Sequence, residues 1–195
     1  MRPHLSMSRR TRRTPFSSRV EAAGASGYTV YNHTLLATSF RGIEVDYWHL
    51  CENVQVWDVS CEKQVTLMGP GANQLAQYMT PRDLTHAKVG RCYYLPMCDE
   101  NGKMMNDAVG IKVNDRHWRL SVADSDVLLW AKGLAVGFGL DVEVREPDIF
   151  PVAVQGPKAE QLMCRVFGDE IKALGFFAIA PFIYKGKRMK VARSG

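Results

Sequence analysis

Asp107 is the residue of this sequence whose position most strongly suggests chemistry. It falls just inside an expected strand, beside Met104 and Met105 and ahead of Ala108. A carboxylate among apolar side chains is either paired with a donor or used in a reaction, because burying it alone costs free energy. Such a group could act as a general base or stabilise a developing positive charge. The alternative, on the residues alone, is a buried aspartate that stabilises the preceding turn.

The other reactive side chains show no arrangement typical of a metal site, a disulfide framework or a nucleotide-binding loop. The five cysteines have no Cys-x-x-Cys spacing, and the five histidines are scattered. No Walker A sequence, Rossmann glycine motif or Gly-x-Ser-x-Gly elbow is present. We therefore expect no bound metal. The odd number of free thiols favours a reducing, cytoplasmic location.

Positive charge is concentrated at the amino terminus. The chain has 195 residues and a net charge of +5, and residues 1–20 hold six arginines and no acid. The rest of the chain is therefore close to neutral and lacks the distributed basic face typical of nucleic-acid binders. No apolar run is long enough for a membrane-spanning helix. These features predict that neither nucleic acid nor a membrane is a partner, and they leave the oligomeric state open.

Three interpretations fit the arginine-rich segment 1–20. It can be a terminal arm that wraps the surface, a mitochondrial or plastid targeting peptide, or a basic arm for an anionic partner. We favour the terminal arm, which places a boundary between residues 1–20 and residues 21–195.

The hydrophobic pattern predicts helices among groups of short strands. Apolar residues at helical spacing indicate helices over residues 43–52, 72–79, 124–140 and 158–167. Alternation indicates strands over residues 54–60, 63–68, 90–97, 103–113, 117–122, 141–144 and 152–155, and residues 176–192 are strand-like. Asp124 or Ser125 is the expected N-cap of the third helix. Turns at Asn101-Gly102 and Asn114-Asp115 join residues 90–122 into an antiparallel meander that carries Asp107. The expected fold class is α+β, with antiparallel β-meanders and packed helices.

Five motifs stand in a familiar order along the chain. They occupy residues 56–60 (VWDVS), 80–84 (TPRDL), 90–107, 152–159 (VAVQGPKA) and 193–195 (RSG). Together they resemble the T-protein, or aminomethyltransferase, superfamily of the glycine cleavage system. Each motif is weak alone, but the set covers nearly the whole chain in the right order and spacing.

At two places the sequence departs from the T-protein pattern. There it more closely resembles the dimethylsulfoniopropionate demethylases of the same superfamily. The family's Asp-Asp pair is Asn106-Asp107 here, and residues 121–127 read SVADSDV. The resemblance implies a folate-binding domain of the T-protein type. It also implies methyl transfer from dimethylsulfoniopropionate to N5 of tetrahydrofolate, releasing methylmercaptopropionate. The alternatives are an aminomethyltransferase of glycine cleavage and a folate-binding relative without methyl transfer.

The resemblance also implies roles for particular residues. Asp107 matches the family's catalytic aspartate position. Tyr94 matches a tyrosine that contacts the pterin, although a half-buried strand aromatic is an equally good interpretation. Asn106, Ser121 and Ser125 are implied as polar walls of the same tetrahydrofolate pocket.

The end of the chain favours a fragment. Residues 191–195 stop in the middle of an expected strand, which would then lack its hairpin partner. The resemblance implies that further pocket residues follow residue 195. We therefore expect an amino-terminal fragment with little activity of its own.

Overall fold

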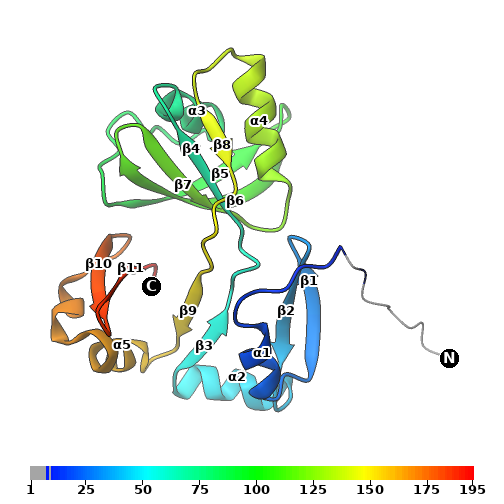
Figure 1. Cartoon of the computed structure of the whole chain (residues 1–195), viewed down its shortest axis with the longest axis vertical. Helices are drawn as coiled ribbons and strands as arrows, with labels where there is room; N and C mark the ends of the chain where they lie inside the picture. Colours follow the sequence, from blue (N-terminus) through cyan, green and yellow to red (C-terminus); the bar gives the residue numbers. More distant parts are fainter. Residues whose placement is uncertain (1–7, 9) are drawn as a thin grey trace. The chain divides into compact units, whose positions relative to one another are not determined.

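The computed structural model describes residue 8 and residues 10–195, which divide into two compact units (Figure 1). Unit 1 comprises residues 1–62 and 149–159, and unit 2 comprises residues 63–148 and 160–195. Arg2 and Arg9 of the basic segment lie outside the described residues. Each unit combines helices with antiparallel strands, so the expected α+β class is confirmed.

Unit 1 is built from helices and two strand pairs. Its elements are α1 (Ser17–Ala22), β1 (Gly27–Tyr31), β2 (Thr34–Ser39), α2 (Ile43–Glu52), β3 (Gln55–Asp58) and β9 (Val152–Gln155). β1 and β2 form a hairpin, and β3 pairs antiparallel with β9. Gly156 follows β9 with a φ of 113°, and a Cβ there would stand 2.3 Å from the carbonyl oxygen of Asn53. Only glycine therefore fits where β9 leaves the strand pair.

Part of the basic segment packs within unit 1. The backbone of Arg12 bridges to Thr34 at the start of β2. The Thr14 hydroxyl donates to the carboxylate of Asp58 in β3. The helix α1 spans residue 20. The expected boundary between a basic arm (residues 1–20) and the rest of the chain stays a prediction.

Unit 2 contains a five-stranded antiparallel sheet of order β5-β6-β7-β4-β8. Its first elements are β4 (Gln64–Met68), α3 (Ala72–Tyr78), β5 (Cys92–Cys98), β6 (Met104–Asn114), β7 (His117–Ser121), α4 (Val127–Gly137) and β8 (Glu143–Arg145). The neighbours β5, β6 and β7 form the predicted meander. β4 pairs with β7 on one side and β8 on the other, which joins strands that are distant in sequence.

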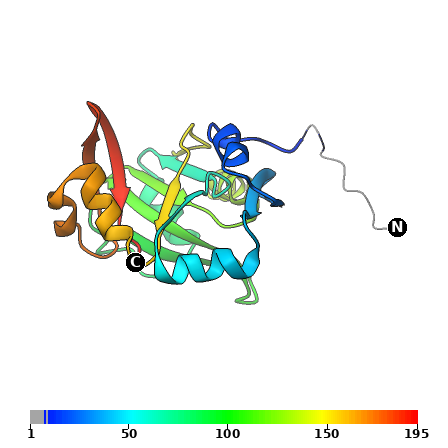
Figure 2. The ribbon, with the colours of Figure 1, turned by 90° about the horizontal axis from the view of Figure 1, so that it is seen from below.

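The last part of unit 2 is a helix and a hairpin. It consists of α5 (Ala159–Phe167), whose first residue belongs to unit 1, the 3-10 helix η1 (Asp169–Ala173), β10 (Ile179–Tyr184) and β11 (Lys187–Ala192). α5 and the hairpin lie side by side in both views (Figures 1 and 2) and share a small core around Phe182. The expectation of an unpartnered last strand is wrong, because β11 pairs with β10 along its whole length.

The core of unit 2 lies between the sheet and the helices α3 and α4. Successive side chains of a strand point to opposite faces, so alternate residues of each strand enter this core. Its largest fully buried strand side chains are Leu67, Leu95, Met97, Trp118 and Leu120. Gly110 of β6 also faces the core, where a Cβ would stand 2.2 Å from Leu95. We call the opposite side of the sheet, which carries Tyr94, Asp107, Val109, His117, Arg119 and Ser121, the outer face.

One expected helix boundary is wrong. α4 begins after Asp126, which occupies the N-cap position without a side-chain capping bond. Ser125 precedes the N-cap, and its hydroxyl accepts a hydrogen bond from Asn106 of β6. Asp124 likewise precedes the N-cap and does not occupy it.

Candidate functional site

The outer face brings three of the five predicted site residues to one side of the sheet. Pro96 of β5 lies opposite Asp107, and Tyr94 lies opposite Val109. Val109 in turn lies opposite Ser121 of β7. Since residues i and i+2 share a face, Asp107 and Val109 point the same way. Asp107, Tyr94 and Ser121 therefore belong to one surface.

Asp107 and Tyr94 are in contact on this surface. The Tyr94 hydroxyl donates to Oδ2 of Asp107 across 3.4 Å, which is a long hydrogen bond. Asp107 is exposed, and Tyr94 is 40% exposed. The interpretation of Asp107 as a buried, turn-stabilising aspartate is therefore wrong. The pair leaves a carboxylate and an aromatic ring accessible to a ligand.

Ser121 lies two strands away from Tyr94 and is half-buried. Its hydroxyl oxygen accepts a hydrogen bond of 2.7 Å from Nε2 of Gln64 in β4. Gln64 is buried and occupies the strand position directly opposite Ser121. This contact orients the serine hydroxyl, whose own proton is free to be donated elsewhere.

Asn106 and Ser125 form a second group on the other side of the sheet. Asn106 is 4% exposed, and its Nδ2 donates to the Ala123 carbonyl at 3.0 Å and to the Ser125 hydroxyl at 2.8 Å. The Ala123 backbone N–H donates back to Oδ1 of Asn106 at 3.2 Å. These bonds hold the loop between β7 and α4 against β6. Because Asn106 precedes Asp107 in a strand, its side chain faces away from Asp107.

We expect Asn106→Ala to lower the free energy of unfolding by about 2 kcal/mol, because it removes the three hydrogen bonds that this buried side chain makes to Ala123 and Ser125. Urea denaturation followed by circular dichroism measures the change. Asn101→Ala in the exposed β5–β6 turn is the matched control and should cost less than about 0.5 kcal/mol. Equal stability of the two variants would show that the Asn106 bonds contribute nothing.

Sequence reasoning missed two basic side chains on the outer face. His117 and Arg119 alternate with the buried Trp118 and Leu120 in β7. Burial lowers the pKa of Arg119. Burial also lowers the pKa of His117, with further lowering by nearby positive charges. In the sequence of β7, polar residues alternate with apolar ones, the polar positions being His117, Arg119 and Ser121. This alternation could have identified the surface before the structure was known.

Unit 1 contains a cavity of about 380 Å³ that holds none of the predicted site residues. Its walls are largely apolar and include Phe16, Tyr28, Leu35, Phe40 and Trp57. Arg13, Arg19, Glu21 and Asp58 add charge at its edge. All five predicted site residues belong to unit 2, and none of them lines this cavity.

Within the described part of the chain, no group of three or more His, Cys, Asp or Glu side chains is placed to hold a metal ion. No described helix has the length and apolar character needed to cross a membrane. All five cysteines are free thiols, and burial raises the pKa of the Cys61 thiol to about 11.

Residues 16–195 match the GCVT N-terminal domain family, and the chain belongs to that family. The fold agrees: the chain superposes on the glycine cleavage system aminomethyltransferase T of Bartonella henselae with a TM-score of 0.76. The sequences are 21% identical over 87% of this chain and 47% of that one.

Two curated relatives show where the chain stands within this family. The dimethylsulfoniopropionate demethylase DmdA of Ruegeria pomeroyi is 50% identical over 188 residues, which is 96% of this chain and 52% of the relative. The aminomethyltransferase of Natranaerobius thermophilus is 27% identical over 82% of this chain and 45% of the relative. The chain thus spans about half the length of the curated relatives it matches.

Proposed function

We propose that this chain takes part in the demethylation of dimethylsulfoniopropionate, with tetrahydrofolate as the methyl acceptor and methylmercaptopropionate as the product. The observation that carries the proposal is the 50% identity to the Ruegeria pomeroyi demethylase over 96% of the chain. The Natranaerobius aminomethyltransferase, at 27% identity, is the more distant of the two relatives. The outer face of unit 2 supplies the residues through which the chain would act.

The residues present on the outer face fit a reduced pterin. Asp107 offers a carboxylate that can accept hydrogen bonds from ring nitrogens. The exposed ring of Tyr94 and the exposed Met105 offer an aromatic and an apolar surface beside it. Ser121 offers a hydroxyl on the same face. When bound, tetrahydrofolate would supply the nucleophilic nitrogen N5 that takes the methyl group.

Asn106 and Ser125 would act indirectly, by holding the backbone of β6 that carries Asp107 in place. Their hydrogen bonds to each other and to Ala123 hold β6 and the start of α4 in register, and neither side chain contacts Asp107. We therefore propose them as residues that position β6, in contrast to the pocket-wall role expected for them.

Asp107 has the chemistry to complete the transfer. A sulfonium methyl carbon is already electrophilic, so its sulfur leaves as a neutral thioether with the bonding electron pair, and no covalent intermediate on the protein is required. With tetrahydrofolate bound, the Asp107 carboxylate would stabilise positive charge developing at N5 and would accept the proton that N5 gives up. Tyr94 donates to Oδ2 of Asp107 and so orients the carboxylate. Holding donor and acceptor in line can lower the barrier by about 7–11 kcal/mol.

The proposal is tested by following 5-methyltetrahydrofolate formation from dimethylsulfoniopropionate and tetrahydrofolate. Because the chain spans about half the length of its relatives, the assay is run on the 195-residue chain and on any longer reading frame that contains it. We expect 5-methyltetrahydrofolate and methylmercaptopropionate in equal amounts and only when both substrates are present, with little turnover by the 195-residue chain compared with a longer reading frame. Tetrahydrofolate binding without either product would contradict the proposal and favour a binding-only relative.

The assay also separates the aminomethyltransferase alternative, which the 27% identity to the Natranaerobius relative supports. That activity would give 5,10-methylenetetrahydrofolate from an aminomethyl-lipoyl carrier protein and none of the thioether. We further propose a reducing, cytoplasmic location, because five free thiols are typical of such a compartment.

A further inference from the structure

Positive side chains gather on the outer face beyond Ser121. Arg119 of β7 and Arg145 of β8 lie on either side of Thr66 in β4, because both pair with Thr66. His117 occupies the next outward-facing position of β7. Burial lowers the pKa of His117 most, and the positive charges of Arg119, Lys190 of β11 and Arg145 lower it further. Lys190 and Arg119 also act on each other, since Arg119 helps to lower the pKa of Lys190.

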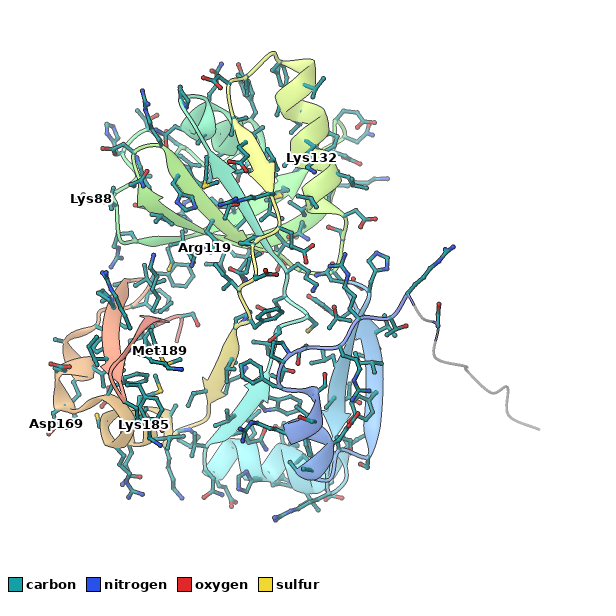
Figure 3. All side chains as sticks on the ribbon, viewed as in Figure 1. Lys88, Arg119, Lys132, Asp169, Lys185 and Met189 are labelled. Atoms are coloured by element: carbon teal, nitrogen blue, oxygen red, sulfur yellow. The ribbon has the colours of Figure 1, made fainter. Side chains whose placement is uncertain are left out.

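This cluster carries more positive than negative charge. Among residues 8 and 10–195, no carboxylate lies within 4.0 Å of a charged nitrogen of Arg119 or Lys190. The carboxylate of Glu143 pairs with Arg145 at 3.5 Å, and both residues lie on the outer face because Val144 between them faces the core. Arg119 is the least satisfied member, because its Nε is buried and has no hydrogen-bond partner (Arg119 is labelled in Figure 3). Nε2 of His117 is buried and unpartnered as well.

An arginine with a buried, unpartnered nitrogen near other positive charges lowers the stability of the folded domain when no anionic ligand is bound. A desolvated guanidinium loses hydration that only an anion or good acceptors replace. Like charges nearby add repulsion, as the lowered pKa of His117 shows. Guanidinium and ammonium groups together are the usual partners of carboxylates, and arginine can bind one in bidentate fashion.

We propose that Arg119, Arg145 and Lys190 form a carboxylate-binding subsite that holds the glutamate end of a folate whose pterin lies at Asp107. This inference rests on the proposed function for the identity of the ligand. The subsite lies on the same outer face as Asp107, Tyr94 and Ser121, and all its residues belong to unit 2.

The spacing along the sheet suits this ligand. Ile111 is four residues beyond Asp107 on β6 and lies directly opposite Arg119. At the usual rise of a strand, those four residues cover roughly 13 Å. The p-aminobenzoyl linker of a folate separates the pterin from the glutamate carboxylates by a comparable span. The carboxylate of dimethylsulfoniopropionate is only two methylene groups from its sulfur, so it cannot reach from Asp107 to Arg119.

Binding to three ligands tests the subsite. Tetrahydrofolate carries pterin and glutamate, 6-methyltetrahydropterin carries the pterin alone, and p-aminobenzoylglutamate carries the tail alone. We expect Arg119→Gln to weaken tetrahydrofolate and p-aminobenzoylglutamate about tenfold or more, the effect of losing one charge-assisted hydrogen bond. Its affinity for 6-methyltetrahydropterin should be unchanged. Arg116→Gln, in the exposed β6–β7 turn, removes the same charge and should change none of the three affinities.

A spectroscopic measurement accompanies the binding curves. Since nearby cations lower the pKa of His117, a bound carboxylate should raise it again. NMR titration of His117 with and without p-aminobenzoylglutamate measures this shift. We expect an upward shift in the wild type and in Arg116→Gln, and a smaller one in Arg119→Gln.

The outcomes separate the subsite from the proposed function. If Arg119→Gln weakens the pterin as much as the folate, or if wild type binds no p-aminobenzoylglutamate, the subsite is overturned. Methyl transfer by the wild type would then still support the proposed function. Tail binding that depends on Arg119 without any methyl transfer would support the subsite and contradict the proposed function.

Discussion

Asp107→Asn is expected to lower the rate of methyl transfer by about 10²-fold or more, the range typical of losing a general base. Asparagine keeps the size and the hydrogen-bonding oxygen of the side chain but can neither take up a proton nor balance a positive charge. The loss should appear in kcat, while the Kd for tetrahydrofolate changes by only a few-fold. Because Asp107 is exposed, the folded state should keep its stability.

The matched control for this variant is Asp115→Asn. Asp115 lies in the β6–β7 turn, its side chain is 89% exposed, and its nearest cation is the Lys112 ammonium at 3.9 Å. It should leave kcat and tetrahydrofolate affinity unchanged. A kcat for Asp107→Asn within twofold of wild type would remove Asp107 from the mechanism. A large loss of tetrahydrofolate affinity with normal kcat at saturation would make it a binding residue instead.

Trp118→Ala is expected to lower the free energy of unfolding by about 4 kcal/mol, as for other large-to-small substitutions at well-packed aromatic sites. Trp118 is 1% exposed and packs with its ring centroid 5.8 Å from that of Tyr93. Its Nε1 donates to Oδ1 of the exposed Asn73 at 2.7 Å, so the substitution also removes this hydrogen bond. The ammonium of Lys112 lies 5.9 Å from the ring centroid and would lose this contact too.

Guanidinium denaturation with a fluorescence or circular dichroism readout measures the Trp118 effect. Trp130→Ala on α4 is the control, because that ring is 43% exposed, and it should cost about 1 kcal/mol or less. Similar losses for both tryptophans would mean that the core between the sheet and the helices is not packed as described. Since Trp118 alternates with Arg119 in β7, its loss should also disturb the outer face.

Much of the local structure follows from the sequence. The helix over 43–52 and the strand over 152–155 agree with α2 and β9 residue for residue. The meander of β5, β6 and β7 also follows, because its two turns join neighbouring strands with short connections. These features depend on interactions between residues close in the chain, which periodicity and turn residues report directly.

The partners of distant strands could not be read from the sequence. β3 pairs with β9 nearly one hundred residues later, and β4 inserts between β7 and β8. Nothing in a strand's own residues specifies which distant edge it joins, because backbone hydrogen bonds are the same for every partner. The positions of Arg119 and Arg145 on either side of Thr66 result from this non-local pairing.

The sequence by itself determined the family and the α+β class, and it singled out Asp107 as a candidate whose role stays a prediction. Strand alternation also required Asn106 and Asp107 to face opposite ways. Only the tertiary structure decided which of the two faces the helices cover, because both faces of β6 carry polar and apolar residues. That choice buries Asn106 against the loop before α4 and leaves Asp107 with Tyr94 on the outer face. The physical reason is that burial belongs to the packed sheet and helices together, and no single segment encodes it.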